Sequence, residues 1–137
     1  TLTDRIVAFF DWRFEAGEML ELQEFTFWLE AECLNLDWRL HSYSKILDLG
    51  RGKDVRLSLQ VRALNKLLPD HLGLVVKCFA KITDAMDQGT QLYISANEAK
   101  PILKAGLNDE DPQVRGNAER ARENLLRLGR FDYLDVE

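Results

Sequence analysis

The stretch from Asn97 to Gly129, NEAKPILKAGLNDEDPQVRGNAERARENLLRLG, contains the signals for two helices and the turn that joins them. Asp111 precedes Pro112, an order typical of a helix start, because the carboxylate accepts hydrogen bonds from free backbone N–H groups and proline presets φ. Gly129 follows the last apolar position, where it suits a left-handed C-terminal cap. The stretch therefore predicts a helix pair with a short acidic turn.

Apolar residues of the second helix fall on one face. They recur at intervals of four, three, four and three residues, which a helix of 3.6 residues per turn places on one side. These residues are Val114, Ala118, Ala121, Leu125 and Leu128. The two alanines favour close approach of a neighbouring helix. The first helix, expected to be capped by Asn97, has a shorter apolar stripe, so both helices need neighbours to cover them.

This helix pair resembles a HEAT-type repeat. The resemblance rests on Leu103, Leu107, Asp111, Pro112, Val114, Arg115, Ala118, Ala121, Leu125 and Leu126. It implies stacked helix pairs with a concave surface for protein partners. The same pattern does not extend over the rest of the chain at a fixed period of about 40 residues.

Five further helices are expected upstream, because apolar residues recur there at helical spacing. They are predicted over 4–16, 19–33, 38–49, 54–68 and 70–87, with Asp37 and Asp70 at the starts of the third and fifth. Residues 91–96 are predicted as a loop or a brief extended piece. The sequence thus predicts one all-α domain over 1–137: stacked antiparallel helix pairs forming a short HEAT-like α-α superhelix of about seven helices.

Composition places the chain in a broad class. Apolar residues make up 46% and charged residues 30%, as in ordinary globular proteins. The net charge of −5 argues against binding nucleic acid or an anionic membrane over the whole surface. No apolar run approaches the roughly 20 residues of a membrane span, and the sequence has no signal peptide pattern. Cys33 and Cys78 each lie in a helical pattern, which predicts two buried free thiols in a cytoplasmic protein.

The two ends suggest how this chain relates to a longer one. The start at Thr1 leads directly into a predicted helix, so we expect the C-terminal fragment of a larger, bacterial-type multidomain protein. The aromatic residues after Gly129 are expected to fold back over the last helices.

The sequence predicts no catalytic residue, no cofactor and no metal. His41 and His71 are thirty residues apart, and no zinc motif accompanies them. The loop at 50–53 has two glycines but not the Lys-Ser or Lys-Thr of a phosphate-binding loop. The acidic run at 109–111 has no distal glutamate of a calcium loop, and helix capping already explains it. We therefore do not expect this chain to be an enzyme.

Two functions are considered. The first is a non-catalytic helical-repeat module for protein–protein or interdomain interaction, with a protein partner or an upstream domain of the same chain. The alternative is a helical domain that binds the nucleic-acid backbone through a local basic cluster. That cluster is Arg51, Lys53, Arg56, Arg62 and Lys66. In the last helix, Glu119 and Glu123 alternate with arginines, which favours a self-neutralised solvent face there.

Overall fold

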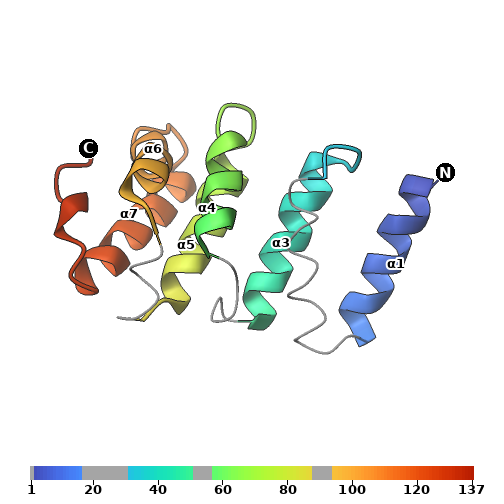
Figure 1. Ribbon diagram of the computed structural model, residues 1–137. Helices are drawn as coiled ribbons and strands as arrows, with labels where there is room; N and C mark the ends of the chain where they lie inside the picture. The colour runs from blue at the N-terminus through green and yellow to red at the C-terminus, as the bar shows by residue number, and fades with distance from the viewer. Residues whose placement is uncertain (1, 17–30, 51–56, 88–93) are drawn as a thin grey trace.

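A computed structural model describes residues 2–16, 31–50, 57–87 and 94–137, and these ranges contain helices but no strand (Figure 1). The helices are α1 (Leu2–Ala16), α3 (Leu36–Gly50), α4 (Leu57–Lys66), α5 (Leu72–Ala85), α6 (Ala96–Leu107) and α7 (Pro112–Arg127), followed by the 3-10 helix η3 (Phe131–Tyr133). The predicted all-α class is confirmed. None of the described helices is long and apolar enough to cross a membrane.

The helices between α3 and α7 form two layers. In one layer α5 packs extensively against α7 on one side and against α3 on the other. In the second layer α4 packs against α6, and both also contact the first layer (Figure 1). Each short turn joins helices of different layers, α4 to α5 and α6 to α7. Helix α1 lies at the N-terminal edge, where the Phe10 ring is 5.6 Å from the Trp38 ring of α3.

Both predicted caps of α7 are confirmed. Asp111 Oδ1 accepts a hydrogen bond from the backbone N–H of Gln113 at 2.8 Å, and Pro112 is the first helical residue. At the other end Gly129 has φ of 89°. The Gly129 N–H donates to Leu126 O and the Arg130 N–H donates to Leu125 O, each at 3.0 Å. This pair of bonds is the Schellman motif, which satisfies the last carbonyls of the helix.

Helices α3 and α6 begin at other residues than the predicted caps indicate. Helix α3 begins at Leu36 because the side chain of Asn35, and not that of Asp37, accepts the Trp38 N–H at 3.0 Å. Helix α6 begins at Ala96 after Ser95, so Asn97 lies within its first turn and is not its cap. In both cases a small polar residue nearer the N-terminus precedes the first helical residue.

Five other predicted ranges differ from the structure or lie partly outside the described residues. Helix α1 begins at Leu2 and not at residue 4. Helix α5 covers Leu72–Ala85 and not 70–87, because a turn occupies 67–70 and places Asp70 before the helix. Helix α4 ends before that turn, and residues 54–56 are outside the described part. Of the predicted helix over 19–33, residues 19–30 are outside it, and Cys33 lies in a turn. Residues 91–93 are also outside, whereas Ala96 is helical.

The core lies between the layers, and α5 is its centre. Seven residues of α5 are buried, namely Val75, Val76, Cys78, Phe79, Ala80, Ile82 and Thr83. From α7, the predicted stripe is buried at its first four positions, from Val114 to Leu125. Gly106 of α6 is buried at the point where α6 meets α5 and α7. The small residues Gly106 and Ala118 therefore let α6 approach α7 closely, as the alanines of α7 predicted.

The segment after α7 folds back over α6 and α7. Tyr133 is fully buried, and Arg122 donates hydrogen bonds to the carbonyl oxygens of Tyr133 at 3.2 Å and Leu134 at 2.7 Å. Arg130 donates to Ile94 O at 2.9 Å. The fold-back of Tyr133 agrees with the prediction, but Phe131 of η3 is 66% exposed.

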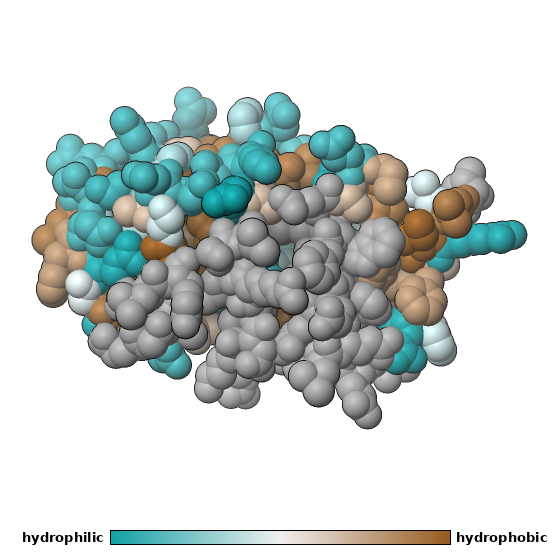
Figure 2. Space-filling model, in the orientation of Figure 1, coloured by the Kyte–Doolittle hydropathy of each residue, from teal (hydrophilic) through white to brown (hydrophobic). Residues whose placement is uncertain are grey.

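Large exposed apolar side chains gather at the two ends of the molecule. At the α1 end they are Leu2, Phe9 and Trp12, and at the η3 end they are Phe131 and Leu134. In the view of Figure 2 polar side chains cover most of the visible described surface between these ends.

Candidate functional site

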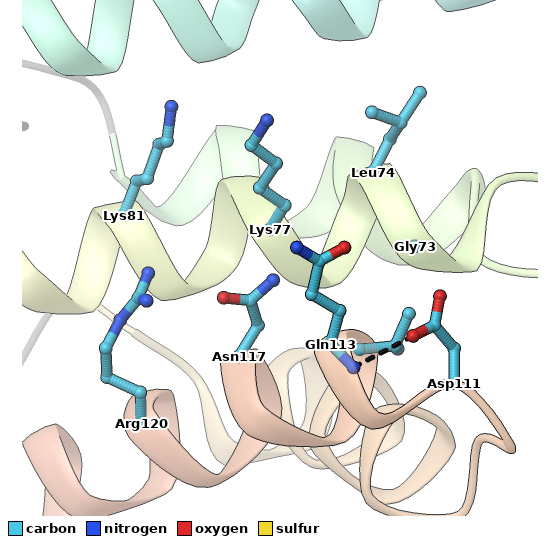
Figure 3. Close-up of a pocket in the computed structure, with 9 residues that line it drawn as sticks. Gly73, Leu74, Lys77, Lys81, Asp111, Gln113, Asn117 and Arg120 are labelled. Atoms are coloured by element: carbon cyan, nitrogen blue, oxygen red, sulfur yellow. Dashed lines mark hydrogen bonds between the residues drawn. The ribbon is translucent and has the colours of Figure 1, made fainter.

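A groove of about 500 Å³ lies between α5 and α7 on the outer face of the first layer (Figure 3). We call it the α5–α7 groove. Its α5 wall includes Gly73, Lys77 and Lys81, and its α7 wall includes Gln113, Asn117 and Arg120. It lies on the opposite side of α5 from the core, so its side chains are available for binding.

The α7 wall presents two amides and one guanidinium on one helical face. Gln113, Asn117 and Arg120 are spaced by four and three residues, and all three extend toward α5 in Figure 3. Within the described residues neither side-chain amide has a hydrogen-bond partner. Arg120 Nε lies 3.2 Å from Asp84 Oδ1. The terminal nitrogens of Arg120 have no partner in the same part of the chain, so they can donate hydrogen bonds to a ligand.

The α5 wall is positively charged. Lys77 is exposed and pairs with no described residue. Lys81 of α5 binds two residues of α3, with Nζ 2.8 Å from Asp48 Oδ2 and 2.7 Å from Ser44 Oγ. With Arg120, three cations line the groove, against the single lining carboxylate of Asp111 among the described residues. Because Asp48 and Asp84 pair with Lys81 and Arg120, the cationic groups of the described lining that are left for a ligand are Lys77 and the terminal nitrogens of Arg120.

A polar network centred on the buried residue Asn124 joins α7 to α5. Asn124 of α7 donates to Asp84 Oδ1 at 2.7 Å and to Thr83 Oγ1 at 3.2 Å. Arg127 donates to Asn124 Oδ1 at 3.0 Å. Because buried polar groups need their partners, these bonds fix the position of α7 along α5. Sequence reasoning missed Asn124, although a polar residue beside the core position Leu125 was a visible signal.

A second hollow of about 690 Å³ lies between α6 and the C-terminal segment. Lys100 and Lys104 line it together with Asp135. Lys100 Nζ pairs with Asp135 Oδ1 at 3.2 Å. The lining carries two lysines and two carboxylates, Asp135 and Glu137, so this hollow offers less unbalanced charge to a ligand than the α5–α7 groove.

The two described residues of the predicted basic cluster lie in the other layer. Arg62 and Lys66 both lie exposed on α4. Arg62 Nε is 3.5 Å from Glu98 Oε1. Arg51, Lys53 and Arg56 are outside the described residues, so binding of nucleic acid by the five remains a prediction.

The two histidines are separate in the structure. His71 Nδ1 lies 3.1 Å from Asp37 Oδ1, a contact that joins the start of α5 to α3. His41 is exposed on α3. In the ranges that the structure describes, no group of three or more His, Cys, Asp or Glu residues is placed to hold a metal ion.

The cysteines differ in exposure. Both are free, but Cys33 is exposed and Cys78 is buried, so the prediction of two buried thiols is wrong for Cys33. The reason is that Cys33 lies in the turn before α3, not on a helix face. Cys78 Sγ is 3.7 Å from Leu40 O, and burial raises the pKa of the Cys78 thiol from 9.0 to about 12.

Thiol reactivity provides a test of this difference. In the native protein a thiol reagent is expected to modify Cys33 quickly and Cys78 only through unfolding, because the reagent attacks an accessible thiolate. Cys33→Ser should abolish the fast phase, and Cys78→Ser should leave it intact. Fast labelling of the Cys33→Ser variant would contradict this assignment.

The raised pKa of Cys78 also makes stability depend on pH. In the folded state the thiol keeps its proton up to a pKa of about 12, so the contribution of the buried thiol to the free energy of unfolding is complete below pH 9.0 and is lost as pH rises toward about 12.

No protein-family model, curated protein or solved structure matches this chain. Its function is therefore inferred from the α5–α7 groove and the side chains that line it.

Proposed function

We propose that this chain is a non-catalytic helical-repeat module that binds a protein partner, or another domain, through the outer face of the α3–α5–α7 layer. The observation that supports this most directly is the α5–α7 groove, whose walls carry side-chain donors with no partner among the described residues. The layering supports the same proposal, because helix pairs stacked in two layers present a continuous outer surface. The HEAT-like character of residues 97–129 is part of the proposal.

The chemistry of the groove favours binding over catalysis. Its walls carry two neutral amides, Gln113 and Asn117, and the cations Lys77, Lys81 and Arg120. Amides and guanidinium groups hold and orient polar ligands through hydrogen bonds. Catalysis by proton transfer or nucleophilic attack calls for a poised base or nucleophile. The described side chains that line the groove do not include such a pair.

We propose a cytoplasmic location as well. Cys33 and Cys78 are both unpaired, and Cys33 is exposed. Exposed free thiols persist in a reducing compartment, whereas oxidising compartments favour disulfides.

Selection from a displayed library of random peptides on the immobilised 137-residue chain tests the proposed function. We expect enriched peptides that bind saturably and lose binding to a Gly116→Leu variant, whose new side chain projects from α7 one residue before the lining residue Asn117. A Cβ atom added at Gly116 would meet nothing within 4 Å, so the variant should fold normally. Failure to enrich any peptide, or enrichment of peptides indifferent to Gly116→Leu, would contradict the proposal.

A further inference from the structure

We propose that the α5–α7 groove binds an acidic peptide segment in extended conformation. The segment's backbone pairs with the amides of Gln113 and Asn117, and its carboxylates pair with Lys77 and Arg120. This inference rests on the proposed function and names the chemistry of the partner.

The two amides match an extended backbone in kind and in spacing. A side-chain amide has an N–H donor and a C=O acceptor, like the peptide unit itself. Residues 113 and 117 are four apart, which separates them by about 6 Å along α7. An extended segment advances by about 6.6 Å over two residues. Gln113 and Asn117 can therefore pair with alternate peptide units of one segment.

The cations lie on opposite walls, and side chains of an extended segment alternate in direction. Arg120 meets Asp84 only through Nε, which leaves both terminal nitrogens available for a carboxylate within the described part of the chain. Lys77 is available from the α5 wall. Charge-assisted bonds to carboxylates are among the stronger hydrogen bonds. In Figure 3 Lys77 extends from α5 away from α7, and Arg120 extends from α7 toward α5, so acidic residues on alternate sides of the segment have one cation each.

One glycine lines the groove and a second lies beside it. Gly73 lines the groove from α5, and Gly116 of α7 directly precedes the lining residue Asn117. Gly116 is exposed within the helix, with nothing within 4 Å of its Cβ position. Glycine at this exposed helical position leaves space for a backbone to approach α7 beside Asn117. A peptide backbone laid along α7 needs that clearance.

Carboxylates around the groove favour a peptide over a nucleic acid. Asp111 lines one end, and Asp48 and Asp84 hold Lys81 and Arg120. A polyanion with a charge at every phosphate would meet these carboxylates, whereas an acidic peptide can place neutral residues beside them.

Fluorescence anisotropy with the whole 137-residue chain tests the proposal. The probe is a labelled, end-blocked peptide of alternating Glu and Thr, and the matched control peptide has Gln in place of Glu. We expect the Glu peptide to bind about tenfold or more tightly than the Gln peptide, and to weaken as salt is added.

Variants locate the binding. Lys77→Glu and Arg120→Gln should each lower the affinity for the Glu peptide about tenfold, and Asn117→Ala should weaken both peptides. Lys104→Glu makes the same charge change as Lys77→Glu on α6, in the other layer, and should have no effect. Circular dichroism verifies that each variant is folded, and Arg120→Gln replaces Lys77→Glu if the latter is not.

Three results would overturn the proposal: equal binding of the two peptides, equal loss with Lys77→Glu and Lys104→Glu, or tighter binding of labelled oligothymidylate that the Lys77 variant removes. The selection from a peptide library distinguishes failure of the acidic-peptide proposal from failure of the proposed function. If selected peptides are not acidic but still lose binding to Gly116→Leu, the interaction module stands and the acidic partner is rejected.

Discussion

Gly106→Ala is expected to destabilise the protein by about 1–3 kcal/mol, the range for forcing an extra carbon into a packed core. A Cβ at position 106 would lie 2.7 Å from Ala118 Cβ, and 3.0 Å from the Val76 Cγ2 atom. Both neighbours belong to buried helices that cannot move without disturbing the core. Chemical denaturation followed by circular dichroism measures the change in the free energy of unfolding.

Gly116→Ala is the matched control, because it is the same substitution in the neighbouring helix. Nothing lies within 4 Å of the Cβ position there. Alanine is therefore expected to stabilise the protein by about 0.5–1 kcal/mol through helix propensity. The two glycine substitutions should thus have opposite signs. Destabilisation of equal size at both positions would show that helix α6 does not approach α5 and α7 as closely as described.

Tyr133→Ala should have a still larger effect, about 3 kcal/mol, the lower part of the range for truncating a fully buried aromatic side chain. Tyr133 is 0% exposed, and the segment around it is fixed by Arg122 and Arg130. Removing the ring empties the space that it fills beside α6 and α7. The same denaturation experiment measures the loss.

Phe131→Ala is the control for Tyr133→Ala. It removes an aromatic ring from the same short helix, but that ring is 66% exposed. Its effect should stay within about 0.5 kcal/mol, as for most surface substitutions. If the two variants lost similar stability, the assignment of Tyr133 to the core and Phe131 to the surface would be wrong.

Much of α7 was predictable from the sequence because its signals are local. The Asp111–Pro112 start and the Gly129 end each depend on residues within a few positions. The buried stripe follows from helical spacing alone. The start of α3 was not predictable in the same way, because Asn35 and Asp37 are both competent caps and the chain uses Asn35.

The candidate site could not be predicted, because it depends on which helices are neighbours. The spacing of Gln113, Asn117 and Arg120 on one face was visible in the sequence. The residues that face them could not be identified from the sequence. Lys77 and Gly73 come from a different helix far earlier in the chain, and packing between helices decides that contact. The sequence instead drew attention to basic residues that follow one another along the chain, of which Arg62 and Lys66 lie in the other layer.

Helix α5 has one side in the core and the other in the groove, so a single helix contributes residues to both. Val76 and Phe79 face inward, whereas Lys77 between them faces solvent. A ligand that binds Lys77 contacts α5, and α5 packs against α3, α4, α6 and α7. A ligand bound in the groove is therefore expected to raise the unfolding temperature of the protein, because a molecule that binds only the folded form shifts the unfolding equilibrium by mass action. Thermal melting can thus report which compounds the protein accepts before any natural partner is known.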